Sequence, residues 1–399
     1  MAIDNKDKKV LKSSIEREQN EVACSAECEK IKGSKNLNVP HLRFPEFTEE
    51  WVNVSLKDVA DFQKERISSG LLDESTYIST ENILQNFQGV QSAISIPANT
   101  NVVAYKKNDI LLSNIRPYLK KVWFSDRIGG CSADVFVLRS KTCEPEFLYN
   151  VIASDKFINY VMSGAKGVKM PRGDKNQMES FSFSIPAVVE QRKISRLFQL
   201  LDERIVTQNK IIEKLQSLIK GLRVCCMQRV YGNNVYLSEI AQIYQPQTIS
   251  STELTEDGFL VYGANGIIGK YKDYNHETEQ ICITCRGNTC GMVNYTKPMS
   301  WITGNAMVIN TDKYQDKVCK RYLYHYLSAY NFNSIISGSG QPQIVRTPLE
   351  KLKITLPTIS EQKQKAIIFD KIQDKIDINH KVLNLYIGQK QYLLRQMFI

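Results

Sequence analysis

The sequence predicts an α+β protein in which two similar globular domains, built from mixed strands and helices, are separated by two long helices. These helices are expected to form an antiparallel coiled coil, with pseudo-twofold symmetry between the halves. Two observations predict this fold. The motif Pro-x-x-x-Glu-Gln opens a heptad-patterned segment at Pro186 and again at Pro357. The strand-like runs in front of both motifs repeat with the same spacing.

The chain therefore divides into five parts: a polar tail at 1–37, a first globular domain at 38–186, a central helix at 187–231, a second globular domain at 232–357, and a C-terminal helix at 358–399. The tail is rich in lysine and glutamate and has few large apolar side chains, which favours a mobile segment. A short docking helix around Val10, Leu11 and Ile15 is the alternative.

The predicted strands of the two domains match at a constant offset, equal to the separation of Pro186 and Pro357. The aligned pairs are Ile110 and Ile281, Val122 and Val293, and Val137 and Val308. Such regularity indicates a duplication. Turns such as Gly129-Gly130 are expected to separate the strands, and the aromatic stretches around Leu148 and Leu323 are expected to pack in the cores. The loops between matched strands differ, so the two frames should recognise different targets.

The two long segments carry apolar residues at alternating spacings of three and four, which is the pattern of a coiled-coil seam. The seam of the first segment comprises Ile194, Phe198, Leu201, Ile205, Gln208, Ile212, Leu215, Ile219 and Leu222. The seam of the second comprises Phe369, Ile372, Ile376, Asn379, Leu383, Tyr386 and Leu393, with Lys365 and Lys390 as weaker flanks. About forty residues at ~1.5 Å each give a rod of about 60 Å, longer than one turn of DNA at ~34 Å.

Gln208 and Asn379 occupy equivalent positions at the midpoints of the two seams. If the helices pair antiparallel, these side chains face each other and form a polar layer that fixes the register at a cost in stability. The alternative is that one or both face solvent. The helix starts differ, because Thr358 can cap the second helix and Ala187 cannot cap the first.

Composition describes a water-soluble protein that attracts polyanions. The formal net charge is +10 and the pI is about 8.9, which favours nucleic acid as a partner. The chain shows neither a signal peptide nor an apolar run long enough to cross a membrane, so a cytoplasmic location with free thiols is expected. Cys282 and Cys285 have CxxC spacing, but a strand would point them to opposite faces, and a metal site is the weaker interpretation.

Motifs for catalysis are absent from the sequence. There is no Asn/Asp-Pro-Pro-Tyr/Phe motif for adenine methylation, no glycine-rich methyl-donor loop and no phosphate-binding loop. The four histidines lie in dissimilar contexts. We therefore expect no catalytic residue, no metal site and no cofactor in the isolated chain.

Several motifs, taken in order, resemble the specificity subunit of type I restriction-modification enzymes. They are Val-Pro-His-Leu-Arg-Phe-Pro-Glu-Phe at 39–47 followed by Trp51, Tyr-Gly-Ala-Asn-Gly-Ile-Ile-Gly-Lys-Tyr at 262–271, the two Pro-x-x-x-Glu-Gln motifs, and Leu-Leu-Arg-Gln-Met-Phe at 393–398. The resemblance covers about residues 38–399. Two departures are the long N-terminal tail and residues 223–227, at the expected end of the first helix, which match 394–398 poorly.

The resemblance implies a function. Each globular domain would be a target-recognition domain that reads one half of a bipartite site in double-stranded DNA. The helices would set the spacer between the halves and dock two methyltransferase subunits, and motor-nuclease subunits would join the full complex. Restriction and adenine-specific methylation would belong to that assembly, so the chain itself would be non-catalytic.

Two loops in each domain combine basic and polar side chains that suit DNA, since lysine and arginine neutralise phosphates and directed donors or acceptors distinguish bases. In the first domain the expected DNA contacts are Ser113, Asn114, Arg116, Lys120, Lys121, Lys166, Lys169, Arg172 and Lys175. In the second they are Thr284, Arg286, Asn288, Thr289, Gln341, Gln343 and Arg346 of these loops, together with Asn265 and Lys270 of the motif at 262–271.

Other roles are open for these residues and for the whole chain. Arg116 and Arg286 could form structural ion pairs, and the glycine-rich loops near Gly167 and Gly338 could be flexible connections. The whole chain could be a coiled-coil scaffold that binds proteins without specific DNA binding, which salt-sensitive binding to duplex DNA would exclude. A stand-alone modification or cutting enzyme would need catalytic motifs that the sequence lacks.

Overall fold

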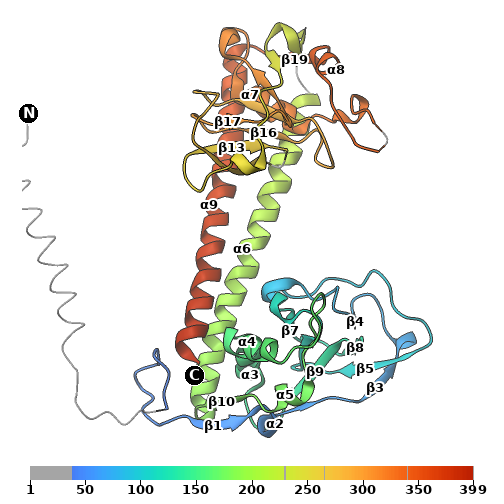
Figure 1. Cartoon of the computed structure of the whole chain (residues 1–399), viewed down its shortest axis with the longest axis vertical. Helices are drawn as coiled ribbons and strands as arrows, with labels where there is room; N and C mark the ends of the chain where they lie inside the picture. Colours follow the sequence, from blue (N-terminus) through green and yellow to red (C-terminus); the bar gives the residue numbers. More distant parts are fainter. Residues whose placement is uncertain (1–37, 229–230, 265, 339, 399) are drawn as a thin grey trace, which may run out of the picture. The chain divides into compact units, whose positions relative to one another are not determined.

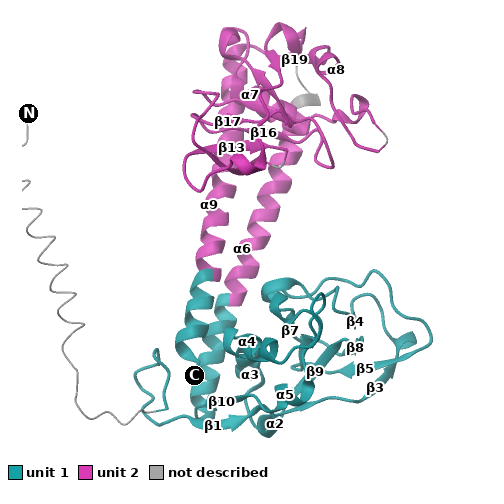
Figure 2. Cartoon of the chain, viewed as in Figure 1, with its two compact units in different colours: residues 1–201, 388–399 teal, residues 202–387 magenta. Residues whose placement is uncertain are grey.

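The structure is a computed structural model that describes residues 38–228, 231–264, 266–338 and 340–398, so the predicted tail at 1–37 lies outside it. The chain forms two compact units (Figure 2): unit 1 is 1–201 with 388–399, and unit 2 is 202–387. Each unit contains a globular part, called head 1 (residues 52–185) or head 2 (residues 233–356). Each also contains part of the long helices α6 (Val188–Gln228) and α9 (Ile359–Met397) (Figure 1).

Head 1 consists of three small sheets with helices beside them. Its central sheet has the order β2-β9-β6-β7, its second sheet β3-β5-β8-β4, and β1 pairs with β10. The strands are β1 (Val52–Ser55), β2 (Ala60–Phe62), β3 (Arg66–Ser68), β4 (Tyr77–Ile78), β5 (Asn101–Tyr105), β6 (Ile110–Ser113), β7 (Val122–Phe124), β8 (Gly129–Cys131), β9 (Val135–Ser140) and β10 (Ser182–Ile185). The helices are α2 (Leu56–Val59), α3 (Pro145–Ile152), α4 (Asp155–Ser163) and α5 (Lys175–Glu179), with short 3-10 turns η1 (Ser69–Leu71), η2 (Gln85–Phe87) and η3 (Pro117–Leu119).

Head 2 repeats this plan with a smaller second sheet. The central sheet has the order β12-β18-β15-β16, the second sheet β14-β13-β17, and β11 pairs with β19. The strands are β11 (Asn233–Tyr236), β12 (Gln242–Tyr244), β13 (Phe259–Gly263), β14 (Gly266–Tyr271), β15 (Ile281–Thr284), β16 (Val293–Tyr295), β17 (Trp301–Ile302), β18 (Ala306–Asn310) and β19 (Lys353–Leu356). The helices are α7 (Lys320–Ala329) and α8 (Arg346–Glu350), with 3-10 turns η4 (Leu237–Glu239), η5 (Ser251–Glu253), η6 (Asp312–Tyr314) and η7 (Phe332–Ser334).

The strand registers confirm the duplication. Ile110 of β6 pairs with Leu138 and Phe124, and Ile281 of β15 pairs with Ile309 and Tyr295. All three positions differ between the heads by the constant offset seen in the sequence. The predicted fold class, with two similar mixed α/β domains and two long helices, is therefore confirmed.

The second sheets are where the heads diverge, and here one prediction is wrong. Gly129-Gly130 is not a turn but most of strand β8, which pairs with β4 and β5. A Cβ on Gly129 would lie 2.2 Å from the Thr76 carbonyl oxygen, and one on Gly130 would lie 2.6 Å from Val102. Glycine is therefore required by close packing of neighbouring chain segments, not by chain reversal.

The two long helices pair antiparallel within each unit. In unit 1, Ile194 and Phe198 near the start of α6 share a core with Leu394 and Met397 near the end of α9. In unit 2, Ile219 near the end of α6 packs against residues from the first half of α9. At the seam midpoint, which lies in unit 2, Gln208 Nε2 donates to the Asn379 carbonyl at 3.2 Å and to its side-chain oxygen. Gln208 is only 8% exposed, so the polar layer exists as the seam pattern indicated.

The repeated Pro-x-x-x-Glu-Gln motif joins each head to its helix. The Gln191 amide donates to the Pro186 carbonyl at 2.8 Å and accepts from the Glu144 backbone N–H, just before α3, at 2.9 Å. Gln362 likewise donates to Pro357 at 2.9 Å and accepts from the backbone N–H before α7 at 2.9 Å. Both glutamines are buried, and each satisfies backbone groups that would otherwise be unpaired.

The CxxC pair has the environment expected of strand residues. Cys282 and Cys285 are both buried, and they belong to different apolar clusters of head 2. Burial raises the pKa of the Cys282 thiol to about 12. Within the described ranges, no group of three or more His, Cys, Asp or Glu is placed to hold a metal ion.

Across the same residues, no helix combines the length and apolar character needed to cross a bilayer.

Candidate nucleic-acid interface

Two loops lie side by side in each head, and both were predicted from the sequence. Loop A follows the central strand, at 113–121 in head 1 and 284–292 in head 2. It is closed by hydrogen bonds from the Ser113 N–H to the Lys121 carbonyl at 3.0 Å and from the Thr284 N–H to the Met292 carbonyl at 2.8 Å. Loop B spans 166–175 in head 1 and 337–346 in head 2.

The same backbone hydrogen bonds join loop A to loop B in both heads. In head 1 the Arg116 N–H donates to the Pro171 carbonyl at 2.8 Å, and in head 2 the Gly287 N–H donates to the Pro342 carbonyl at 3.0 Å. Isolated bridges pair Ile115 with Arg172 and, at the equivalent positions of head 2, Arg286 with Gln343. The duplicated frame thus presents one composite two-loop surface per head, with different side chains on it.

Loop A of head 1 has backbone strain that head 2 avoids. Arg116 and Lys120 have φ of 51°, in the left-handed region, where the equivalent residues Gly287 and Gly291 have φ of 83° and 91°. A side chain in this conformation costs about 1 kcal/mol or more. Pro117 restricts the residue before it further. Glycine would relieve this strain at position 116, as it does at the equivalent Gly287.

The side chains predicted to contact DNA in head 1 fall into two groups. Arg116 and Lys169 are exposed and have no side-chain partner among the residues that the structure describes. The other basic residues are paired: Lys120 with Asp155, Lys121 with the Thr80 carbonyl, Lys166 with Asp174, Arg172 with Asp134, and Lys175 with Glu179. Lys166 and Arg172 remain mostly exposed despite their pairs, so a phosphate could displace these partners.

Head 2 shows the same division. The side chains of Arg286, Asn288, Gln341 and Gln343 are exposed without a partner within the described part of the chain. Lys270 lies on β14 beside Asp257 at 3.4 Å, and Arg346 pairs with Glu350 at 2.7 Å. Asn265 lies outside the described residues. The free arginine and three amides suit base and phosphate contacts.

Two hydroxyls predicted to contact DNA are instead buried beneath loop A. Ser113 is 1% exposed and donates to the Ile115 carbonyl at 3.1 Å, and Thr284 is fully buried and donates to the Ala264 carbonyl at 2.5 Å. Neither can reach a duplex directly, so both are removed from the proposed contacts. The side-chain oxygen of Asn114 is also buried and has no hydrogen-bond partner. Sequence reasoning missed Tyr118, a half-exposed aromatic on loop A.

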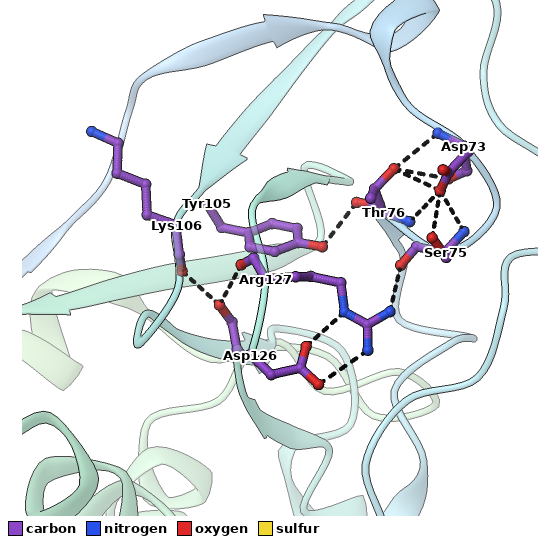
Figure 3. A network of polar contacts seen from close by, with 8 residues as sticks. Asp73, Ser75, Thr76, Tyr105, Lys106, Asp126 and Arg127 are labelled. Atoms are coloured by element: carbon purple, nitrogen blue, oxygen red, sulfur yellow. Dashed lines mark hydrogen bonds and ion pairs between the residues drawn. The ribbon is translucent and has the colours of Figure 1, made fainter.

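A polar network fixes the turn that leads into β4 in head 1 (Figure 3). The Asp73 carboxylate accepts from the backbone and hydroxyl of Ser75 and of Thr76 at 2.6–2.9 Å, which lowers the pKa of Asp73 to about 2. The Tyr105 hydroxyl donates to the Thr76 carbonyl at 2.9 Å, and Arg127 donates to the Ser75 carbonyl at 3.3 Å. This turn therefore holds β4, which ends beside loop A, in a defined place.

The sequence comparisons agree with this architecture. The family model for the type I restriction modification DNA specificity domain matches the chain twice, at residues 48–217 and 233–385. The chain belongs to this family. A specificity subunit of the type I restriction enzyme MjaVIII from Methanocaldococcus jannaschii is 24% identical over 85% of this chain and 89% of its own length. The EcoprrI specificity subunit of Escherichia coli is 31% identical over 36% of each chain.

Solved structures share the fold. The S subunit of a type I restriction-modification system from M. genitalium superposes with a TM-score of 0.63 at 16% identity, over 90% of this chain and 99% of that one. A second type I system structure superposes with a TM-score of 0.54 at 18% identity, over 87% and 96%. Recognition of DNA sequence is the role of this family, whose members are generally non-catalytic and assemble with other restriction-modification subunits.

Proposed function

We propose that this chain reads a bipartite site in double-stranded DNA, with head 1 on one half and head 2 on the other. The observation that carries the proposal is the repeated two-loop surface, joined by equivalent hydrogen bonds in both heads but bearing different exposed side chains. The same two-loop frame with dissimilar side chains suits two different half-sites. Arg116 and Lys169 in head 1, and Arg286, Asn288, Gln341 and Gln343 in head 2, are the main proposed contacts.

The proposed partners follow from the helices. We assign α6 and α9 to docking two methyltransferase subunits and to setting the spacer, with motor-nuclease subunits in the complete assembly. Adenine-specific methylation and cleavage then belong to the partners, and this chain supplies only the recognition of the DNA sequence. If the helices set the spacer, adding one heptad to each should lengthen it by about 10 Å, or roughly three base pairs at about 3.4 Å each.

Methylation mapping tests the proposal. The full chain is co-expressed with its methyltransferase partner, and modified positions are found by sequencing. The expected wild-type result is two short specified half-sites separated by a fixed unspecified spacer. A single contiguous site would contradict the proposal. Failure of the chain to bind duplex DNA in a salt-sensitive way would favour the protein-binding scaffold instead.

Two arginine variants test whether each head reads a different half-site. Arg116→Ala should relax one base in one half-site, and Arg286→Ala one base in the other, each by about 1–3 kcal/mol of discrimination. Arg116→Gly is the matched control for strain, because it removes the side chain and lets the backbone adopt the left-handed conformation without strain. It should weaken recognition like Arg116→Ala without lowering the free energy of unfolding. Both variants relaxing the same half-site would refute the assignment.

A further inference from the structure

The ends of β4 and β13 occupy equivalent places in the two heads. Ile78 of β4 pairs with Cys131, and Tyr262 of β13 pairs with Ile302, which is the head 2 equivalent of Cys131 at the constant sequence offset. Both of these pairings are parallel. Two positions beyond Ile78 and Tyr262 lie Thr80 and Ala264, so their carbonyl groups are equivalent even though the second sheets around them differ.

In head 1, loop A is attached to the segment after β4 at several points. Lys121 Nζ donates to the Thr80 carbonyl at 2.6 Å. The Phe87 N–H donates to the Lys120 carbonyl at 3.3 Å, and Lys120 itself pairs with Asp155 at the start of α4. These lysines therefore face inward to the protein, although their sequence context predicts contacts with phosphates.

In head 2 the equivalent carbonyl is used by neutral groups. Thr284 Oγ1 donates to the Ala264 carbonyl at 2.5 Å, and Thr289 Oγ1 donates to the same oxygen at 3.1 Å. A carbonyl oxygen has two lone pairs and can accept both. Thr284 and Thr289 stand at the start and in the middle of loop A, so the two bonds fix the loop against the end of β13.

The anchor in head 1 is itself well held. The turn before β4 is fixed by the Asp73 network (Figure 3), and the Gly130 N–H donates to the Thr76 carbonyl at 3.1 Å. A loop bonded to such a point cannot shift by much without breaking a charge-assisted hydrogen bond, which is among the stronger kinds. Because base contacts require placement within fractions of an ångström, this rigidity bears on recognition.

We propose that the Thr80 and Ala264 carbonyl groups are a common anchor for loop A, and that Lys121, Thr284 and Thr289 are positioning residues for target recognition. They hold the loop that carries Arg116 or Arg286 and do not contact phosphates. The recognition part of this inference rests on the proposed function. The anchoring part concerns the free chain and is testable alone.

Hydrogen exchange on the free full-length chain tests the anchor without DNA. Lys121→Met keeps the aliphatic length and removes the ammonium donor, so amides of residues 113–121 should exchange about tenfold faster. Lys169→Met makes the same chemical change on loop B, where the lysine has no described partner, and should leave residues 113–121 unchanged. Equal exchange of loop A in wild type and Lys121→Met overturns the anchor.

Salt dependence of binding to a 40-base-pair duplex pool of random sequence separates positioning from phosphate contact. Each lost phosphate contact lowers the slope of log affinity against log salt by about 0.9. Lys169→Met should lower the slope by that amount, and Lys121→Met should leave it unchanged. A slope lowered equally by both substitutions identifies Lys121 as a phosphate contact and overturns its positioning role.

Thr284 gives the recognition readout, because it is fully buried and cannot touch the duplex. Selection from the same pool should give a motif in which Thr284→Val relaxes the head 2 half by about tenfold, while Thr284→Ser, which keeps the hydroxyl, restores wild-type selectivity. A Thr284→Val motif identical to the wild-type motif overturns the positioning role. If the wild-type chain selects no motif while loosened exchange in Lys121→Met stands, the proposed function fails and the anchor survives.

Discussion

In both units the head packs against the long helices at equivalent positions, but the contact is apolar in unit 1 and polar in unit 2. In unit 1, Leu394 of α9 lies in an apolar core with Phe147 and Phe198. In unit 2 the equivalent residue is Arg223 of α6, which donates to Nδ1 of His325 at 2.8 and 3.2 Å. The poor sequence match between residues 223–227 and 394–398 therefore marks a change of core chemistry.

The polar core of unit 2 is a connected chain of contacts. Because Arg223 donates to Nδ1 of His325, that nitrogen carries no proton, and the Nε2 proton of the neutral ring is donated to Asp370 at 2.8 Å. Arg321 binds the same carboxylate at 2.9 and 3.0 Å and lies over the Tyr295 ring at 4.3 Å. Counted from the backbone N–H groups that donate to Gln191 and Gln362, at Glu144 and Cys319, the residue equivalent to His325 is Asn150 of α3. Asn150 donates to the Glu146 carbonyl instead.

This difference teaches that duplication preserved backbone geometry more strictly than packing. The registers of the central sheets, the Gln191 and Gln362 contacts and the loop bridges are the same in both units, because each is a backbone requirement. The cores where the heads meet the long helices differ: unit 1 has aromatic and aliphatic side chains there, and unit 2 has a charged network. Buried networks need every member satisfied, so unit 2 should be the half more sensitive to pH and to the loss of a single polar group.

The largest expected effects come from the equivalent phenylalanines of the seam. Phe198 is fully buried and packs against Phe398 at 5.7 Å, whereas Phe369 packs against the His325 ring at 5.0 Å. Phe198→Ala should lower the free energy of unfolding of unit 1 by about 3–5 kcal/mol. Phe369→Ala should cost less, about 3 kcal/mol, because the space opens on one side to the polar His325, while its other neighbours are apolar.

Hydrogen exchange of peptides from α3 and α7 reports the two units separately in these variants. Phe198→Ala should accelerate exchange in α3 more than Phe369→Ala accelerates it in α7. The reverse order would show that the polar core depends on close packing more than the apolar one, contrary to the contrast between the two units.

The glutamines of the repeated motif should behave alike. Gln191→Leu and Gln362→Leu each leave a buried backbone N–H and a buried carbonyl without a partner, which should cost about 2–3 kcal/mol. Urea denaturation followed by far-ultraviolet circular dichroism measures the loss. Gln→Glu at either site keeps the acceptor but turns a buried carboxyl group towards the proline carbonyl, so it should lose at least as much as Gln→Leu. Unequal losses at the two sites would mean that the motif is not structurally equivalent in the two units.

The features predictable from sequence are those with a repeat or a period. The constant offset located β6, β9 and β10 and their counterparts, and the heptads located Gln208 opposite Asn379. Apart from β8 and β17, the strands of the second sheets share no sequence offset. The strand character of Gly129-Gly130 depends on Thr76, which lies far earlier in the chain. The sequence predicts Lys121 as a DNA contact because its actual acceptor is a backbone carbonyl, that of Thr80. Every residue has such a carbonyl, so no residue type in the sequence marks it as the partner.

Acidification should weaken unit 2 before unit 1. Burial lowers the pKa of His325 below its usual 6.5, and burial also lowers that of His276 in the same unit. The unfolded chain then binds protons that folded unit 2 does not, so stability is full above about pH 6.5 and falls as pH drops through that value towards the folded pKa. Each unit of pKa shift corresponds to about 1.4 kcal/mol.

Asp370 adds a second loss at lower pH. Burial raises its pKa, but hydrogen bonds from His325 and Arg321 outweigh burial and lower it overall, so that loss begins only below about pH 4. Exchange protection of α7 at pH 7.5 and 5.5, with α3 as the internal reference, measures the first step. His325→Asn, the residue of unit 1, should reduce the pH dependence of α7, and an unchanged dependence would assign it elsewhere.

The smallest effect concerns the helix starts, where the units differ by one hydroxyl. The Thr358 hydroxyl accepts from the Glu361 backbone N–H at 3.3 Å, and the equivalent Ala187 offers no acceptor. Ala187→Thr should stabilise unit 1 by about 0.5–1 kcal/mol, and Thr358→Ala should destabilise unit 2 by a similar amount. Ala187→Val, which has the shape of threonine without its hydroxyl, separates capping from added side-chain bulk. If valine stabilised unit 1 as much as threonine, the gain would come from apolar contact, and the two helix starts would not differ in capping as their sequences indicate.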